Sequence, residues 1–233
     1  MLRKELMIPV SAAAMEQGAY RRTYDYLIRL QVLDEIETLS NLSQNWPNEN
    51  ANKLFLEWKT RLTFSQYSLS TLEPVLRVRR ALIDIALDQI ENDVLKNKLK
   101  TELSHCWLMS AKVARKAGQL SKAYNLLLEA QKFSNKEVFI ERAKLNWARL
   151  NKSEAIEILK SGISEQFPNL ADGFEKNDIT KYSPDDLSVC GKAKLLLARF
   201  YDEAQNLNPE KVPIYYNEAK SLVPKSEDVF YYR

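Results

Sequence analysis

The sequence predicts an all-α protein, an α-solenoid of antiparallel helical hairpins, and three observations lead to this fold class. The 233 residues include only 5 glycines and 8 prolines, so few positions suit tight β-turns, and residues of high helix propensity are abundant throughout. Apolar residues recur at intervals of three and four along most of the chain, which is the spacing of an amphipathic helix. Part of this pattern also repeats along the chain.

The apolar spacing gives the expected helices in order. They cover about 11–44, 50–67, 72–91, 93–117, 121–133, 136–150, 153–166, 185–206 and 209–222, with a turn at 45–50 and another helix starting at 227. Local start signals support two of them. Ser70 and Glu73 form a capping-box pattern ahead of Pro74, and Ser183 followed by Pro184 and two acids is typical of a helix N-terminus.

Two helical hairpins repeat at an offset of 32 residues. The matching pairs are Trp107 and Phe139, Ala111 and Ala143, Val113 and Leu145, Ala123 and Ala155, Leu127 and Leu159, and Ala130 and Gly162. Matches spread over two successive helices are typical of a hairpin solenoid. Because packed helix axes lie about 8–10 Å apart, only small side chains fit where helices cross. We therefore expect the small members of these pairs at the crossings and the large members between them.

A third hairpin is expected towards the end of the chain. Tyr216, Ala219 and Pro224 reproduce the second-helix pattern, but the step from Gly162 to Ala219 is 25 residues longer than the repeat. The polar stretch 167–186 accounts for the excess and is expected to be an inserted loop. The single helical-repeat segment 1–233 then consists of N-terminal helices at about 1–92, two hairpins at 93–166, the loop at 167–186, and a further hairpin with a truncated next helix at 187–233.

Charge and cysteine content exclude several classes of protein. The 34 basic and 31 acidic residues are interspersed and sum to +3, which predicts no direct nucleic-acid partner. No apolar run approaches the roughly 20 residues of a membrane span, so no membrane partner is expected. Cys106 and Cys190 are far apart in the sequence, which suits neither a disulfide framework nor a metal site and favours a reducing intracellular setting.

Catalytic, cofactor and metal sites are all expected to be absent. The glycines are scattered, so phosphate-binding loops are missing, as are the kinase catalytic-loop and Asp-Phe-Gly motifs. The single histidine, His105, precedes Cys106, but successive helical residues point about 100° apart and do not form a nucleophile–base pair. We therefore predict that this chain is not an enzyme.

Six basic residues form the remaining candidate site, for which two interpretations stay open. They are Arg77, Arg79, Arg80, Lys112, Arg115 and Lys116. As a surface patch they would bind phosphate or an acidic partner. As a structural cluster they would be partly buried, because Arg79 falls on the same stripe as Leu76, Ile83 and Ala86. A buried Arg79 would pair with a carboxylate, and its loss would cost about 3 kcal/mol or more.

The hairpin pattern resembles the tetratricopeptide repeat. Its order of large, small, turn-glycine, small, large and small residues is followed by Trp107, Ala111, Gly118, Ala123, Leu127 and Ala130. Two features depart from it. Ser110 stands where a leucine is expected, and the second hairpin has Leu150 or Asn151 at its turn in place of the glycine.

A resemblance over nearly the whole chain is to the FAT region of the phosphatidylinositol-kinase-like protein kinases, and specifically of their ATR group of checkpoint kinases. It is carried by Val-Ala-Arg-Lys-Ala-Gly at 113–118, Ala-Tyr-Asn at 123–125 and Glu-Arg-Ala-Lys at 141–144, and by Trp107 and Trp147. The stretches 11–37 and 73–82 also resemble that region, whereas about 45–70 and 167–190 are variable.

The resemblance implies a non-catalytic scaffold that clamps and regulates a kinase domain. The family kinase is nuclear, acts in the DNA-damage response and phosphorylates Ser or Thr followed by Gln. The implied partners are the parent's own kinase domain and flanking helical repeats, ATRIP as the family's partner, and a second copy in a homodimer formed through the parent assembly. Because 226–233 begins a new amphipathic helix, we expect a segment of a larger protein. The alternative is a free-standing tetratricopeptide-like adaptor that binds a partner peptide in its groove and has polar end caps.

Overall fold

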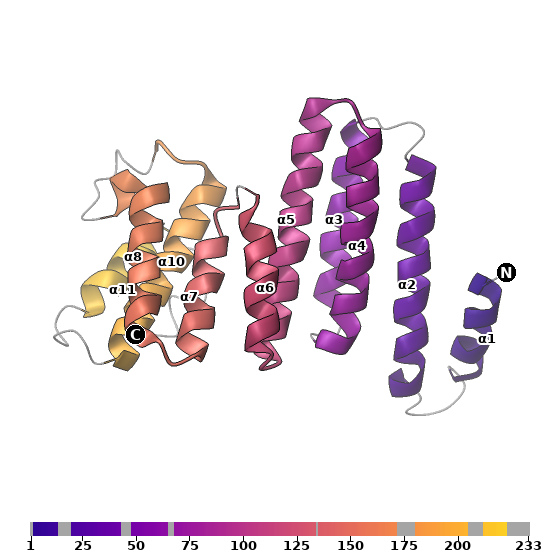
Figure 1. Ribbon diagram of the computed structural model, residues 1–233, viewed down its shortest axis with the longest axis horizontal. Coiled ribbons are helices and arrows are strands. Elements are labelled where there is room, and N and C mark those ends of the chain that lie inside the picture. Colours follow the sequence, from indigo (N-terminus) through magenta and orange to yellow (C-terminus); the bar gives the residue numbers. More distant parts are fainter. Residues whose placement is uncertain are drawn as a thin grey trace. The chain divides into compact units, whose positions relative to one another are not determined.

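The computed structural model describes residues 2–13, 20–42, 48–64, 68–133, 135–171, 180–204 and 212–222. All regular structure in these ranges is helical, which confirms the predicted all-α class (Figure 1). The helices are α1 (Leu2–Ala13), α2 (Tyr20–Leu42), α3 (Asn48–Phe64), α4 (Leu69–Gln89), α5 (Asp93–Lys116), α6 (Leu120–Gln131), α7 (Val138–Ala148), α8 (Lys152–Gln166), the 3₁₀ helix η1 (Pro168–Leu170), α10 (Pro184–Ala204) and α11 (Val212–Leu222). Among the described helices, none combines the length and apolarity needed to cross a membrane.

The chain forms two compact units, residues 1–135 and 136–233. In the first, α1 packs on α2, α2 on α4, α4 on α5, and α5 on α6; in the second, α7 packs on α8, α8 on α10, and α10 on α11. Each unit is therefore a succession of packed helices, as in an α-solenoid. The division between the units falls between the two predicted hairpins, whereas the finer division of the chain stays a prediction.

Of the two helix starts predicted from capping signals, the one at α10 is confirmed and the one at α4 is wrong. At α10 the prediction is confirmed, because the Asp186 N–H donates to the Ser183 hydroxyl at 3.2 Å and Pro184 is the first helical residue. At α4 the capping-box prediction is wrong. The cap is Ser68, whose hydroxyl accepts from the Thr71 N–H at 3.3 Å, and Pro74 lies inside the helix. The earlier start adds Leu69 to the side chains that pack against the core.

The N-terminal helices also differ from the prediction. The single helix expected at 11–44 is two helices, and the first begins at Leu2 and contains Pro9. The turn expected at 45–50 is in part the first turn of α3, which begins at Asn48. The remaining residues of that turn, the helix expected from 227 and Pro224 lie outside the described residues.

Small side chains line the hairpin contacts in both units. In the α5–α6 hairpin, Ala111, Ala123 and Ala130 have no exposed surface, and in the α7–α8 hairpin the same holds for Ala143 and Ala155. Larger buried residues lie between them on the same helices, as Leu127 and Leu159 do. This arrangement allows the helix axes to approach closely, because a leucine at an alanine position would meet packed backbone and side chains.

Gly162 lies at a close contact between α7 and α8 in the second unit. A Cβ atom at this position would lie 2.4 Å from the Cδ2 atom of Phe139 on the facing helix. The ring of Phe139 therefore occupies the space that any other residue's side chain would need. Farther along the same unit, Tyr216 is partly buried and packs against a small cluster that contains Ala219 and Leu195.

Each unit also has an apolar core. In the first, Trp58 on α3, Leu76 on α4 and Leu99 on α5 are almost fully buried. In the second, Trp147 and Phe200 stack with ring centroids 3.9 Å apart and planes 7° from parallel. Such aromatic contacts add to the free energy of area burial alone.

The turns of the α5–α6 and α7–α8 hairpins have the same backbone motif, but only the first has a glycine at its left-handed position. At the end of α5, Gly118 has φ +76°, and the N–H groups of Gly118 and Gln119 donate to the carbonyls of Arg115 and Ala114. At the end of α7, Leu150 has φ +67° and takes part in the same pair of hydrogen bonds. This is the Schellman motif, whose left-handed position favours glycine. Leu150 therefore holds a strained backbone conformation.

We predict that Leu150→Gly stabilises the chain by about 0.5–1 kcal/mol. The gain is the relief of about 1–2 kcal/mol of left-handed strain, reduced by the larger conformational entropy of glycine in the unfolded chain. Leu150 is 82% exposed, so little buried surface is lost. The measurement is the free energy of unfolding in urea.

The matched control is Gly118→Ala, which introduces the strain that the first variant removes. A Cβ at Gly118 meets no heavy atom within 4 Å, so only the backbone conformation is affected. We expect a loss of about 1 kcal/mol. Destabilisation by Leu150→Gly, or no effect of Gly118→Ala, would contradict this account of the turns.

Candidate functional site

Helix α4 carries two consecutive buried arginines, Arg79 and Arg80. Because successive helical residues point about 100° apart, the two side chains leave the helix in different directions. Arg79 contacts α2 and α3, and Arg80 contacts α5. Polar side chains thus connect α4 to its neighbours on both sides.

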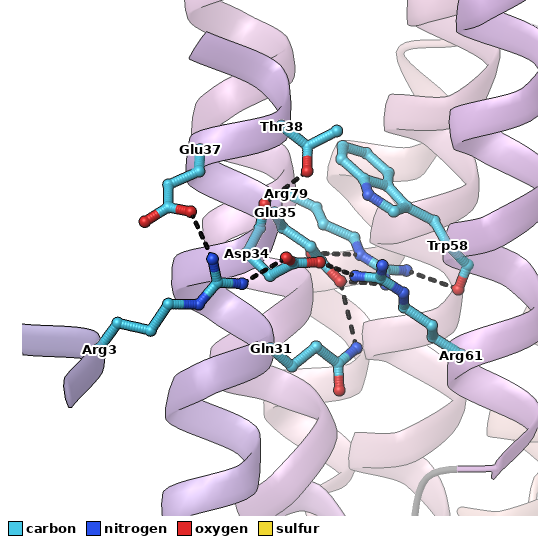
Figure 2. A network of polar contacts seen from close by, with 9 residues as sticks. All are labelled: Arg3, Gln31, Asp34, Glu35, Glu37, Thr38, Trp58, Arg61 and Arg79. Atoms are coloured by element: carbon cyan, nitrogen blue, oxygen red, sulfur yellow. Dashed lines mark hydrogen bonds and ion pairs between the residues drawn. The ribbon is translucent and has the colours of Figure 1, made fainter. Parts of the chain in front are cut away.

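The Arg79 cluster consists of Arg79, Glu35, Gln31 and Trp58 (Figure 2). The Nε and Nη2 atoms of Arg79 donate to the two carboxylate oxygens of Glu35 at 2.8 and 2.6 Å. Its Nη1 atom donates to the backbone carbonyl of Trp58 at 3.2 Å, and the guanidinium lies 4.9 Å from the centroid of the Trp58 ring. Gln31 donates to Glu35 at 3.1 Å. One side chain of α4 therefore binds α2 and α3 at once.

The pair formed by Arg79 and Glu35 is excluded from water. The exposed fractions of the two side chains are 2% and 0%. Removing two charges from water costs several kcal/mol per ion, and the two-pronged geometry with its additional hydrogen bonds offsets that cost. Folding of the first unit therefore requires both charges, because loss of either one leaves the other buried without a partner.

The Arg80 cluster consists of Arg80, Glu73, Ser110 and Trp107. The Nη2 atom of Arg80 donates to Glu73 at 3.0 Å, and its Nη1 atom donates to the Ser110 hydroxyl on α5. The guanidinium lies 4.2 Å from the centroid of the Trp107 ring, which gives a cation–π contact. The serine that departs from the tetratricopeptide pattern is thus an acceptor for a buried arginine.

Asp34, which precedes Glu35 on α2, makes a second set of links near the surface. It accepts from Arg3 of α1 and from Arg61 of α3, both at 2.7 Å, and Arg3 also donates to Glu37 at 2.9 Å (Figure 2). Partial burial acts to raise the pKa of Asp34, but the hydrogen bonds and charges of Arg61 and Arg3 outweigh it and hold that pKa below its usual value.

Together these contacts form a network that joins five helices of the first unit. Arg3 joins α1 to α2, Arg61 and Asp34 join α3 to α2, Arg79 joins α4 to α2 and α3, and Arg80 joins α4 to α5. A fifth contact, between Lys59 of α3 and Glu102 of α5 at 3.2 Å, completes it. We call this set of side chains the helix-linking network.

Comparison with known proteins places the chain in a family. The family model described as "FAT domain" matches residues 1–232. The chain belongs to the FAT domain family.

Relatives of this FAT chain are named "Serine/threonine-protein kinase ATR". The protein from Drosophila melanogaster is 29% identical over 226 residues, 93% of this chain and 9% of the relative. Those from Arabidopsis thaliana and Caenorhabditis elegans are each 30% identical, over 69% and 81% of this chain and 6% and 7% of the relatives. The FAT chain therefore spans less than a tenth of the length of these kinases.

The six basic residues of the FAT chain separate into two groups. Arg79 and Arg80 are buried in the clusters described above, which is the arrangement expected of the structural alternative. Arg77 and Lys116 are exposed, and Lys112 and Arg115 are half-buried. The structure thus does not gather all six into one surface patch.

Sequence reasoning missed the acidic partners in the FAT chain. Glu35 was expected only as an unspecified carboxylate, and the links through Asp34, Arg3 and Arg61 were not expected at all. The position of Arg79 on an apolar stripe pointed to a buried carboxylate. Ser110 at a leucine position pointed instead to the acceptor of Arg80, and no sequence signal pointed to the links through Asp34.

Both cysteines of the FAT chain are buried, and burial is the main cause that raises the pKa of their thiols. It raises the pKa of Cys106 to about 12 and that of Cys190 to about 11. Since the thiolate is the nucleophilic form, neither side chain is activated at neutral pH.

We predict that Arg79→Met destabilises the first unit by about 3–5 kcal/mol, because it leaves the Glu35 carboxylate buried without its partner. Arg79→Met combined with Glu35→Leu is expected to lose much less, since no uncompensated charge remains. Urea unfolding of the two single variants and the double variant gives the coupling free energy. Additive effects of the two substitutions would contradict the account of the pair as mutually dependent charges.

We further predict a pH dependence from Asp34. Its folded-state pKa is lowered, so its contribution to stability is present above the ordinary pKa of an aspartate and disappears as pH falls through the lowered value. Asp34→Asn should therefore destabilise the chain at pH 7 and have little effect near pH 2. The comparison requires urea unfolding of both proteins at the two pH values.

Asp84 is a control for Asp34, because its pKa is shifted in the opposite direction. Burial and the charge of Asp88 raise its pKa, in spite of the opposing charge of Arg80. Ionised Asp84 therefore lowers stability at neutral pH, and Asp84→Asn should raise it at pH 7 with little effect near pH 2. Equal effects of the two substitutions at pH 7 would contradict both assignments.

Proposed function

We propose that this chain is a non-catalytic scaffold segment of an ATR-like Ser/Thr checkpoint kinase, a FAT solenoid that clamps and regulates the kinase domain and supports assembly. The observation that carries the proposal is the family match over residues 1–232, together with relatives that are named as ATR kinases and extend far beyond the matched region. The parent protein acts in the nucleus in the response to DNA damage.

The helix-linking network supports a mechanical role. In stacked helices each element contacts mainly its neighbours, so displacement of one helix reaches the next through the contacts that join them. Arg79 contacts α2 and α3 through rigid two-pronged and backbone hydrogen bonds, and Arg80, the next residue, contacts α5. A displacement of α2 therefore acts on α4, and through α4 on α5.

The proposed partners follow from the same assignment. They are the kinase domain and flanking helical repeats of the parent, ATRIP, and a second copy of the parent in a homodimer. In this proposal the segment contributes shape and stiffness to the assembly and no reacting group.

The parent assignment is tested by sequencing transcripts across codon 233. A kinase domain encoded downstream is the expected result. A transcript that encodes no kinase domain would overturn the assignment and favour the free-standing adaptor.

The clamping role is tested in the full-length kinase by measuring phosphorylation of a Ser-Gln peptide. We expect Arg79→Met to lower the rate several-fold, because the unpaired Glu35 loosens the contacts between α2 and α4. Arg79→Met with Glu35→Leu should recover most of the rate. A kinase with the full rate in the single variant, despite a lowered unfolding temperature, would contradict the role of this segment in regulation.

A further inference from the structure

A hollow of about 430 Å³ lies between the first half of α5 and the segment that follows α6, within the unit 1–135. Two lysines, Lys100 and Lys132, line it together with the polar residues Asn97, Thr101, Ser104 and Asn135 and with Phe133. None of the described lining residues is acidic. A lining rich in hydrogen-bond donors and positive charge suits a negatively charged oxygen ligand.

Ser104, one of the lining residues, has a buried hydroxyl without a partner among the described residues. Its side chain is 1% exposed, and its Oγ atom makes no hydrogen bond with any residue that the structure describes. A buried hydroxyl without a partner costs about 1–3 kcal/mol. A ligand oxygen in the hollow would accept the hydrogen bond that is missing.

The charge in and around the hollow favours a carboxylate over a phosphate. Lys132 is held by Glu129, whose two oxygens lie 2.8 and 2.7 Å from its Nζ atom. Lys100 has no ion pair with a described residue, so one positive charge remains uncompensated. A carboxylate of charge −1 balances it, whereas a phosphate group of about −1.5 to −2 would exceed it and be repelled by Glu129.

A second hollow of about 400 Å³ adjoins the first, and Thr101 on α5 lines both. The second is lined by Phe55 and Leu56 of α3, by Asn52 and Lys59 of the same helix, and by Lys98 and Glu102 of α5. The Glu102 carboxylate is paired with Lys59 at 3.2 Å, which leaves Lys98 as the remaining positive charge of this lining. Leu56 is 65% exposed, which leaves an apolar surface next to the basic one. A ligand that lies across α5 at Thr101 would therefore meet donors on one side and apolar surface on the other.

We propose that a short acidic segment of a protein partner binds across α5 at Thr101. An Asp or Glu carboxylate lies in the first hollow and accepts from Lys100 and Ser104, and a neighbouring apolar side chain of the same segment packs on Leu56. This surface is additional to the scaffold role and does not depend on contact with a kinase domain.

The test uses the 233-residue chain and a fluorescein-labelled ten-residue peptide in which Glu and Asp flank a leucine. Fluorescence anisotropy should show saturable binding that weakens with added salt. Lys100→Glu should weaken it by at least about tenfold, as expected for the loss of a charge-assisted hydrogen bond. Ser104→Ala should weaken it several-fold without lowering the unfolding midpoint, because the removed hydroxyl has no partner among the described residues.

Lys96→Gln is the matched control, since Lys96 lies on the same helix but lines neither hollow. It should leave binding unchanged, and a peptide with Gln and Asn in place of the acids should not bind. Absence of binding by the acidic peptide, equal binding of the two peptides, or unchanged binding by Lys100→Glu would overturn the proposal. Tighter binding of a phosphoserine peptide than of the acidic one would overturn the choice of a carboxylate.

Discussion

The buried pair of Arg79 and Glu35 is the interaction on which the first unit depends, because each buried charge is stabilised only by the other. The hydrophobic effect alone would accept several small rotations of α2 against α4, since apolar contacts are not directional. A two-pronged ion pair, with the Glu35 oxygens 2.6 and 2.8 Å from the Arg79 nitrogens, is compatible with very few of these rotations. The pair therefore sets the register of two helices, and the carbonyl of Trp58 extends this constraint to a third helix.

The adjacent Arg80 links α4 to α5 in a similar way, through buried polar contacts. Its guanidinium lies on the ring of Trp107 and donates to the Ser110 hydroxyl, so a tetratricopeptide-like hairpin is joined to the helices before it by a polar contact. A leucine at position 110 would bury more apolar surface but would leave Arg80 without that acceptor. In this FAT domain, buried polar groups thus join α4 to defined positions on its neighbours, and alanines in the hairpins permit the close packing.

These properties are consistent with a segment whose proposed work is to transmit position rather than to catalyse. A scaffold needs contacts that resist sliding, and those contacts are concentrated here on two consecutive residues of one helix. The basic hollows beside Thr101 are different in kind. The described lining of the first hollow contains two lysines and no acidic residue, so it suits a negatively charged external ligand rather than another helix of the chain.

The sequence by itself determined the features that depend on local periodicity. The helical class, the cap at Ser183, the small residues of the hairpins and the inward direction of Arg79 all follow from which residues share a helical face. Only the tertiary structure decided which carboxylate meets Arg79, because Asp34 and Glu35 are adjacent acids and the pairing spans 44 residues. The structure also showed that Leu150 takes the left-handed position of its turn, and that α4 starts at Leu69, after the cap at Ser68, rather than at 72. The pairing of Arg79 with Glu35 depends on packing between segments distant in the sequence, which local periodicity does not encode.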